Sequence, residues 1–351
     1  MTRILLTGAN WYGSNARSCA DSLRRLGCDV LDIDEETFFP PASVFSSRVA
    51  WRLLRSKMSR EFNSAILNAA RTFRYDFFLS MKGTHIERNT LRVLAQAGRP
   101  LYNFYPDTSA FQFGHWLPEA LPEYDCVFYT KPFWYNDVAS RITLKSAHFI
   151  PHGFDPVLHR SFPLNNDDRR DYACDVSFIA TFTSYKESVL AKLVRLRPNI
   201  NLSIWGDRWT RKSTAPELRK HIKGFPLLGE RYSRAVQSAR INLAIMSGIM
   251  PGASSGDLTT SRTYTIPACG GFMLHERNDE VLGLYTEGTE IACFASPEEL
   301  ATMIDHYLAV PEERETIARA GQNRCVPAYS YDNRMADLLH WHTQHYPLIS
   351  G

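Results

Sequence analysis

A strand–loop–helix–strand pattern occurs twice in this chain and restricts its fold more than any other feature. Residues 3–8 are an apolar run that ends in glycine, residues 16–26 have a helical pattern, and residues 29–34 read as a second strand. The same pattern returns between residues 175 and 206. Units of this kind build parallel α/β sheets, and two of them in 351 residues predict two domains of similar size.

Composition narrows the classes of function. The chain is 44% hydrophobic and 22% charged with a formal net charge of +3, which favours a globular protein and gives no electrostatic case for a nucleic-acid or membrane-surface partner. Its seven cysteines include no C-x-x-C pair, so neither a zinc ribbon nor a disulfide framework is indicated, and a reduced, cytoplasmic compartment is expected. No apolar run approaches the ~18 residues of a membrane span, so we expect neither a signal peptide nor a transmembrane segment.

The stretch Ser254–Leu274 (SSGDLTTSRTYTIPACGGFML) carries the clearest candidate site. It passes from a polar loop into a short amphipathic segment, a turn of small residues at 268–271, and an apolar strand. Loop, helix start and glycine turn can together present backbone N–H groups, Gly270 and the Arg262 guanidinium to an anion. The expected anion is a phosphate.

The same stretch resembles the segment S-R-T-[FY]-E-I-P-A-x-G-G-F of the CgeB-like (spore maturation protein) glycosyltransferases, of the GT-B superfamily. The resemblance covers the C-terminal half well, and the N-terminal half only in outline. Its further motifs are Glu287–Ile291, Ser296–Leu300, Pro311–Arg314 and Ala320–Gln322. It implies an α/β fold of two Rossmann-like domains facing a central cleft, with a nucleotide-sugar donor held mainly by the second.

We expect three parts on this basis. Residues 1–162 form an acceptor-side domain, residues 163–330 form the donor domain, and residues 331–351 are a helix that crosses back to the N-terminal domain. The polar, charge-rich segment 163–172 is the expected linker. Residues 247–256, with three glycines and a proline, are expected to be a mobile loop.

The resemblance assigns the donor to loops of the second domain. Thr183 and Lys186 offer a hydroxyl and a cation near a helix N-terminus, which suits a diphosphate, although N-capping by Ser184 is an alternative use of such hydroxyls. The sequence around Gly206 resembles the G-x-x-W that follows the second strand in the family. The expected donor-binding residues are Thr181, Thr183, Lys186, Trp205, Gly206, Arg262, Thr265 and Gly270.

Many retaining GT-B transferases carry Glu-x7-Glu before an A-x-G turn, with one Glu for the donor sugar and one for the ribose. Aligning that turn with residues 268–270 places Asp257 at the first position and Thr265 at the second. A carboxylate at 257 can still accept a sugar hydroxyl, but Thr265 departs from the Glu of the family. Either Glu276 or Glu280 contacts the ribose instead, or the donor differs, or activity is lost.

Arg262 is the expected catalytic cation, together with Asp257 on the donor sugar. Its guanidinium can fork onto the diphosphate and stabilise the leaving nucleoside diphosphate, and Lys186 shares this duty. The two cations stand in for a metal, since no D-x-D motif lies at a predicted strand end. The alternative for Arg262 is a surface or interdomain salt bridge. We therefore expect no metal and no cofactor apart from the donor substrate.

The loop Thr7–Gly13 has two interpretations. Its T-G-A-N-x-x-G resembles the nucleotide loop of short-chain dehydrogenases, but Trp11 stands where a dinucleotide fingerprint needs its middle glycine. In the GT-B interpretation Trp11 and Tyr12 stack on an acceptor. His115 is a candidate general base, or alternatively a structural histidine. The residues expected on the acceptor side are Gly8, Trp11, Tyr12, Gly13, Lys82, Asp107 and His152, by their position at strand ends.

The expected function is metal-independent transfer of a sugar from a nucleoside-diphosphate sugar, with UDP as the expected nucleotide. Retention of configuration follows from the resemblance to Glu-x7-Glu enzymes. The acceptor is open among a glycan, a protein, a nucleobase and a small molecule, as is the oligomeric state. The alternatives are a nucleotide-sugar epimerase, an NAD(P)-dependent Rossmann enzyme, and a GT-B-shaped binding protein in which Thr265 marks a decayed donor site.

Overall fold

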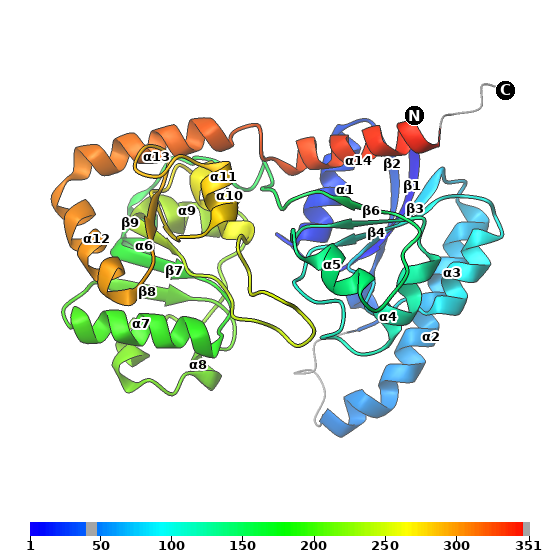
Figure 1. The fold of residues 1–351 in the computed structure, drawn as a ribbon, viewed down its shortest axis with the longest axis horizontal. Helices are drawn as coiled ribbons and strands as arrows, with labels where there is room; N and C mark the ends of the chain where they lie inside the picture. The colour runs from blue at the N-terminus through cyan, green and yellow to red at the C-terminus, as the bar shows by residue number, and fades with distance from the viewer. Residues whose placement is uncertain (40–47, 347–351) are drawn as a thin grey trace. The chain divides into compact units, whose positions relative to one another are not determined.

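The computed structural model describes residues 1–39 and 48–346, and the chain divides into two compact units (Figure 1). Unit 1 consists of Met1–His152, Met250–Ser255 and Tyr331–Gly351, and unit 2 consists of Gly153–Ile249 and Gly256–Ser330. The chain therefore passes between the units four times. Among the described residues, no helix combines the length and apolar character that crossing a membrane requires.

Unit 1 is built on a six-stranded sheet in which every pair of neighbours is parallel. The strands, in spatial order, are β2 (Asp29–Asp34), β1 (Arg3–Gly8), β3 (Phe77–Met81), β4 (Leu101–Tyr105), β5 (Cys126–Tyr129) and β6 (Ala147–Phe149). The order reverses between β1 and β3. In open parallel sheets a crevice opens at such a switch point, beyond the carboxyl ends of the strands.

Helices cover both faces of this sheet. They are α1 (Asn15–Arg25), α2 (Arg48–Thr72), α3 (Arg88–Ala95), α4 (Trp116–Ala120), α5 (Trp134–Ala139) and α14 (Tyr331–His345), with 3-10 turns η1 (Glu35–Thr37) and η3 (Leu121–Glu123). Side chains of β1 alternate between two apolar cores, because successive residues of a strand point to opposite faces. Ile4 and Leu6 lie in the core with α1 and α14, whereas Leu5 lies in the core with α2 and α3.

The terminal helix α14, red in Figure 1, packs in unit 1 beside α1. Met335, Leu338 and Trp341 bury their side chains in the core on that face of the sheet. Nδ1 of His342 lies 2.8 Å from the hydroxyl of Tyr102 inside this core. The last helix of the chain thus covers part of one face of the sheet in unit 1.

Unit 2 repeats the plan with a five-stranded, wholly parallel sheet. The strands, in spatial order, are β11 (Ala292–Phe294), β10 (Met273–Glu276), β9 (Ala239–Ala244), β7 (Cys174–Ile179) and β8 (Leu202–Trp205). The switch point lies between β7 and β9. The helices are α6 (Asn166–Tyr172), α7 (Ser184–Leu196), α8 (Trp209–Lys212), η4 (Pro216–His221), α9 (Glu230–Ser238), α10 (Ser261–Ala268), α11 (Asp279–Leu284), α12 (Pro297–Ala309) and α13 (Pro311–Cys325).

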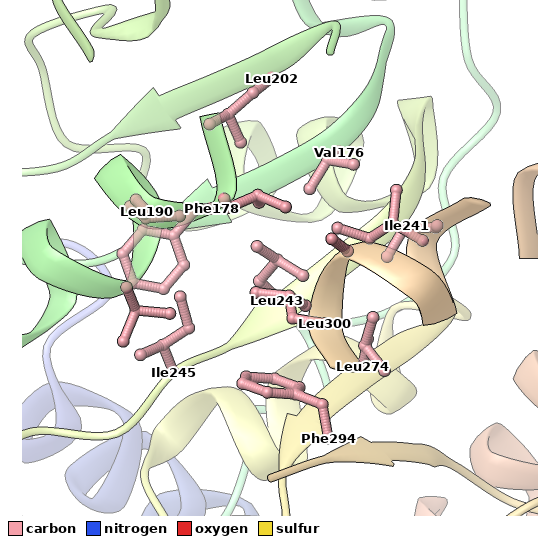
Figure 2. Close-up of a cluster of buried hydrophobic side chains, with 14 of the residues drawn as sticks. Val176, Phe178, Leu190, Leu202, Ile241, Leu243, Ile245, Leu274, Phe294 and Leu300 are labelled. Carbon is pink, nitrogen blue, oxygen red and sulfur yellow. The ribbon is translucent and has the colours of Figure 1, made fainter. Parts of the chain in front are cut away.

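Two apolar cores hold unit 2 together, one on each face of its sheet. Figure 2 shows one of them, in which Leu190 of α7 and Leu300 of α12 meet Phe178, Leu243 and other strand residues. The other core contains residues of α9, α10 and α11. The expected α/β fold of two Rossmann-like parts is confirmed.

The segment expected as a linker, 163–172, instead contains helix α6. Asn165 accepts a hydrogen bond from the N–H of Asp168 at 2.8 Å, and Asp168 accepts one from the N–H of Asn165 at 3.0 Å. This reciprocal cap satisfies two backbone donors that a helix start leaves open. Its charged residues therefore initiate a helix, and the prediction of a linker was wrong here.

Residues 250–255 belong to unit 1, although both flanking segments belong to unit 2. The hydroxyl of Ser109 donates to the carbonyl of Pro251 at 2.7 Å, and the N–H of Ser254 donates to Asp137 at 2.8 Å. Gly252 has a φ of +83°, and a Cβ there would lie 2.9 Å from the Phe111 ring. The loop expected to be mobile is held at this point by specific contacts.

Candidate active site

Lys186 lies in the first turn of α7, which follows β7 directly. Thr183, not Ser184, caps this helix: its hydroxyl accepts a hydrogen bond from the N–H of Lys186 at 3.3 Å. The Lys186 ammonium donates to the carbonyl of Thr181 at 3.3 Å, and the residue is only 4% exposed. An ammonium is rarely buried this deeply unless an anion is paired with it.

Arg262 lies in the first turn of α10 and is also buried, at 9% exposure. Its Nη2 donates to the carbonyl of Ile245 at 2.8 Å, and its guanidinium lies 5.6 Å from the centre of the Phe178 ring. Among the described residues, Nε of Arg262 is buried without a hydrogen-bond partner. It belongs to the first turn of the helix, where an anion finds open N–H donors and the positive end of the helix dipole.

Lys186, Arg262 and Asp257 influence one another electrostatically. Burial and then repulsion by Arg262 lower the pKa of Lys186 to about 7, while Asp257 raises it. Burial also lowers the pKa of Arg262, against attraction by Asp257. Two buried cations thus face one carboxylate near the switch point of unit 2. Three residues that the sequence predicts for one site are brought together.

A hydrogen-bond network fixes the start of α10. The hydroxyl of Thr263 accepts from the N–H of Thr260 at 3.1 Å and lies 2.9 Å from Nε2 of His275. Nδ1 of His275 lies 2.7 Å from the carbonyl oxygen of Glu276, which places the ring proton on Nδ1 and leaves Nε2 to accept from Thr263. The strand end of β10 therefore orients the helix that carries Arg262.

The loop after β8 requires the glycine found there. Gly206 has a φ of +135°, and a Cβ at this position would lie 2.0 Å from the carbonyl oxygen of Ala180, just after β7. Only glycine permits this approach. The neighbouring Trp205 is 1% exposed and packs in a core of unit 2, so its indole supports the loop from below.

Thr265, at the position of the expected ribose-binding Glu, is buried. Its hydroxyl oxygen lies 2.7 Å from that of Tyr232 on α9. Glu276 accepts hydrogen bonds from the N–H of Met246, at 2.9 Å, and from the hydroxyl of Tyr185. Glu280 accepts from the hydroxyl of Thr259 at 2.8 Å, directly beside the start of α10. Both carboxylates lie on the same side of unit 2 as the start of this helix.

Gly270 does not lie near Arg262 at the start of α10. It follows the last turn of α10 and precedes β10, so it lies at the amino edge of the sheet, whereas Arg262 lies at the opposite end of the helix. Eight helical residues separate the two ends by about 12 Å. Gly270 makes the turn, with a φ of +77°, and the helix start alone offers the anion site.

Unit 1 has a cavity of about 540 Å³ at its own switch point. Loops after β1, β3 and β4 line it, and they contribute three of the predicted acceptor-side residues, Trp11, Lys82 and Asp107. The Lys82 ammonium forms an ion pair with Asp107 at 2.8 Å and lies 3.8 Å from the centre of the Phe113 ring. Trp11 is 41% exposed.

Three residues that sequence reasoning missed also line this cavity: Glu35, Arg55 and His85. Nδ1 of His85 is hydrogen-bonded to the Glu35 carboxylate, and its ring stacks on Phe39 at a centroid distance of 4.0 Å. His85 follows β3 by four residues, so its position at a strand end was a usable signal. Glu35 comes directly after β2 in the same way.

The other acceptor-side predictions have different positions. Gly8 lets α1 approach β3, since a Cβ there would lie 2.8 Å from the Cβ atoms of Ala16 and Met81. Gly13 has a φ of +83°, as its turn requires. The Tyr12 ring lies 5.7 Å from the Arg17 guanidinium and does not line the cavity in the part of the chain that the structure describes.

The two histidines predicted from the sequence are also outside the cavity lining. His115 is exposed at the start of α4, with its ring 5.8 Å from Trp116. His152 is 6% exposed, and its Nε2 lies 3.0 Å from the carbonyl oxygen of Pro106. The histidine that the structure places in the cavity wall is His85.

The dinucleotide interpretation of the first loop loses support. Asn10 uses its backbone N–H to bind Asp34 at 3.0 Å and its side-chain amide to bind Asp32 at 2.8 Å. These carboxylates, at the end of β2, are where a Rossmann enzyme would bind the ribose of NAD. Here both carboxylates accept hydrogen bonds from Asn10 and so hold the first loop against the end of β2.

Comparisons with known proteins agree with this architecture. Residues 185–340 match the model of a family described as glycosyl transferase-like. None of the curated protein sequences compared matches the chain.

Solved structures share the fold over the whole chain. Sucrose-phosphate synthase from Thermosynechococcus elongatus is 14% identical, with a TM-score of 0.68 and 99% of each chain covered. HepE from Anabaena, in complex with UDP-glucose, is 12% identical with a TM-score of 0.66, over 97% of this chain and 100% of that one. A UDP-N-acetylglucosamine 2-epimerase described as putative, from Listeria monocytogenes, is 11% identical with a TM-score of 0.54, over 98% of this chain and 96% of that one.

The family match and the shared fold both indicate a glycosyltransferase. The match places a glycosyltransferase-like segment over most of unit 2 and helix α14. The solved structures cover both parallel sheets of this chain in one alignment. The protein therefore has the GT-B fold, and its comparisons support a glycosyltransferase.

Proposed function

We propose that this protein transfers a sugar from a UDP-sugar donor, whose diphosphate binds at Lys186 and Arg262. The observation that carries the proposal is a pair of buried cations, Lys186 and Arg262, which lie close enough to repel each other and to be attracted by the carboxylate of Asp257. A buried excess of positive charge is costly unless an anion neutralises it. A diphosphate supplies that charge, and it also supplies an acceptor for Nε of Arg262.

The same groups suit the chemistry of glycosyl transfer. As the bond from the anomeric carbon to the β-phosphate oxygen breaks, negative charge collects on that phosphate, where Lys186 and Arg262 stabilise it. The acceptor hydroxyl oxygen bonds to the anomeric carbon. We propose retention of configuration, in which the hydroxyl proton passes to the departing phosphate oxygen on the same face of the sugar. Asp257 accepts a hydrogen bond from a donor-sugar hydroxyl.

The nucleoside is placed next to α10. The hydroxyl of Thr265 is hydrogen-bonded to that of Tyr232. We therefore assign the ribose hydroxyls to a carboxylate elsewhere in unit 2, because position 265 lacks the second Glu of the Glu-x7-Glu pattern. Glu280 is the better candidate, because its contact with Thr259 adjoins the helix start, whereas Glu276 already accepts from Met246 and Tyr185. The transfer is proposed to need no metal, since the two cations supply the charge that a metal ion would supply.

Binding of UDP tests this proposal directly. UDP at about a hundred times its dissociation constant stabilises a protein by about 2.7 kcal/mol, which a thermal-shift assay detects. We expect such a shift with UDP, with and without EDTA, and release of UDP from a UDP-sugar during turnover. Lys186→Met and Arg262→Met are each expected to weaken UDP binding at least about tenfold.

The stability of the two variants distinguishes loss of the binding site from damage to the fold. Each variant removes one of two buried cations that repel each other, so we expect it to raise the stability of the free protein while it lowers the affinity for UDP. Arg195→Ala is the matched control, because Arg195 lies at the other end of α7 and pairs with Glu217 at the surface. Stabilisation by NAD alone, or conversion of the sugar without UDP release, would contradict the proposal and favour an oxidoreductase or an epimerase.

A further inference from the structure

The cavity of unit 1 has a different character from the anion site of unit 2. It lies at the β1–β3 switch point, where loops at the carboxyl ends of strands form a crevice, and its volume of about 540 Å³ is that of a small-molecule site. All the residues that define it belong to unit 1. The cavity can therefore be considered without reference to the donor site.

The charges in its wall balance. Among the described lining residues there are two carboxylates, Glu35 and Asp107, and two permanent cations, Arg55 and Lys82. Lys82 pairs with Asp107 at 2.8 Å, and Glu35 is bonded to His85. Compensated charges of this kind do not select an ion. They present donors and acceptors to a neutral ligand.

The polar groups are suited to hydroxyls. Glu35 accepts from Nδ1 of His85, which leaves Nε2 of the imidazole for a ligand. A hydroxyl can bond to that nitrogen as donor or as acceptor. The ammonium of Lys82 and the carboxylate of Asp107 form a second donor–acceptor pair, and a hydroxyl of the ligand can bind both.

Apolar side chains also line the cavity. The indole of Trp11 and the ring of Phe113 contribute to the cavity wall together with Met81 and Pro106. A sugar ring has the matching surface, because its C–H faces are apolar and its edge carries hydroxyls. A flat aromatic wall with a few fixed polar groups is the usual composition of a site for such a ligand.

We propose that this cavity binds an uncharged sugar ring, held by Trp11 and by the His85–Glu35 and Lys82–Asp107 pairs, and that this sugar is the acceptor. The second clause rests on the proposed function, whereas the first does not. The proposal narrows the acceptor class to a neutral glycan or glycoside, and it predicts weaker binding of nucleobases and sugar phosphates.

Ligand-observed NMR with the full chain tests the inference. The probes are the methyl glycosides of glucose, galactose and mannose, with glucose 6-phosphate and glucuronate as charged analogues and uridine as the nucleobase probe. We expect saturation transfer to at least one methyl glycoside, and no tighter binding of its charged analogue. Trp11→Ala and His85→Phe are each expected to weaken that binding at least about tenfold.

Tyr135→Ala is the matched control. Tyr135 is an aromatic residue of unit 1 that is 43% exposed, close to the 41% of Trp11, and it packs on Tyr129 away from the cavity. Binding of UDP provides the second readout, because the cavity variants should leave it unchanged. Loss of glycoside binding with intact UDP binding supports a sugar site in unit 1 and also shows that the variants are folded.

Three results would overturn the inference. They are the absence of binding by every methyl glycoside at millimolar concentration, tighter binding of glucose 6-phosphate or uridine than of any glycoside, and glycoside binding that survives Trp11→Ala and His85→Phe. Failure of the proposed function is read separately, as the absence of UDP binding in the unaltered protein. Glycoside binding without UDP binding would retain the sugar site and remove its role as acceptor site.

Discussion

The hydroxyl oxygens of Thr265 and Tyr232 lie 2.7 Å apart in the interior of unit 2. Thr265 is 5% exposed and Tyr232 is 8% exposed, and burial raises the pKa of Tyr232, so its hydroxyl stays protonated. In the family that the sequence resembles, the position of Thr265 holds a Glu that binds ribose. Here it joins α10 to α9, which makes it a structural residue.

Thr265→Val should therefore affect stability and leave the donor site intact. The change preserves shape but leaves the Tyr232 hydroxyl buried without its partner, which costs about 1–3 kcal/mol. Urea denaturation measures the loss, and calorimetry with UDP measures the affinity. The double variant with Tyr232→Phe should recover part of the loss, because both polar partners are then removed. A tenfold loss of UDP affinity in Thr265→Val would show that this hydroxyl contacts the ribose after all.

Binding of UDP should weaken as pH rises above 7. The pKa of Lys186 in the free protein is about 7, so its ammonium is charged below that pH and progressively neutral above it. A bound diphosphate favours the charged form, so binding takes up a proton in this range. Calorimetry in buffers of different ionisation enthalpy measures that uptake. Lys186→Arg, which does not titrate, should flatten the profile, and an unchanged profile would exclude Lys186 from the site.

Lys186 should also make the free energy of unfolding of the free protein increase as pH rises above 7. The unfolded chain binds a proton at Lys186 up to a pKa of about 10.4, whereas the folded state loses it near 7. Because the unfolded state holds more protons between these values, stability should rise with pH across that window. Unfolding in urea at pH 7 and pH 9 measures this, and Lys186→Met should reduce the rise.

His275 should make the protein sensitive to acid. Its pKa is lowered to about 4, because burial and repulsion by Arg262 outweigh the bond to the Glu276 carbonyl. The unfolded chain binds a proton there below about 6.5, so stability should fall as pH decreases from 6.5 to 4 and then level off for this group. Urea denaturation at several pH values gives the slope. His275→Gln should make the slope shallower, and an equal slope would mean that other groups cause it.

Glu280→Gln should weaken UDP binding through the ribose. The expected result is a loss of affinity for UDP together with a smaller difference between UDP and 2′-deoxy-UDP, because the contact with the ribose is a charge-assisted hydrogen bond. Competition binding with the two nucleotides measures both quantities. Glu276→Gln is the comparison, and it should preserve the difference. If Glu276→Gln alone removes it, the ribose contact belongs to Glu276.

Tyr285→Phe should destabilise unit 2 for a reason specific to α10. Pro267 has no N–H to donate to the carbonyl of Thr263 four residues earlier, and the Tyr285 hydroxyl donates to that carbonyl at 3.0 Å instead. Losing this bond should cost about 1–3 kcal/mol in urea denaturation. Tyr307→Phe is the control, since its hydroxyl makes no hydrogen bond in the described part of the chain. Equal losses in the two variants would contradict this role.

Most of the fold was predictable because apolar strands followed by helical patterns leave few arrangements. The bounds expected for the first two strands, Arg3–Gly8 and Asp29–Asp34, are those observed, and the expected last helix begins at Tyr331 as α14 does. Helix α6 was missed because its many charges resemble those of a linker, and the cap between Asn165 and Asp168 was not considered. Local hydrogen bonding, rather than hydrophobic pattern, decided that segment.

The candidate sites were predictable where strand order decides the position. Lys186 and Arg262 follow neighbouring strands of unit 2, so the carboxyl ends of those strands bring them together. Gly270 was grouped with them because sequence proximity does not show that a helix separates its two ends. His115 was a candidate only by its position after a strand, and nothing in the sequence beyond a position of the same kind marks His85 as the histidine of the cavity wall. The pairing of His85 with Glu35 joins residues fifty positions apart, which no local pattern reveals.

Residues 250–255 have a consequence for engineering. Since they belong to unit 1 while the sequence on both sides belongs to unit 2, neither unit is a continuous piece of the gene. A chimera that exchanges residues 153–330 as one block would bring a foreign hexapeptide against Ser109 and Asp137. Chimeras meant to recombine donor and acceptor specificities should therefore keep these six residues with the N-terminal half.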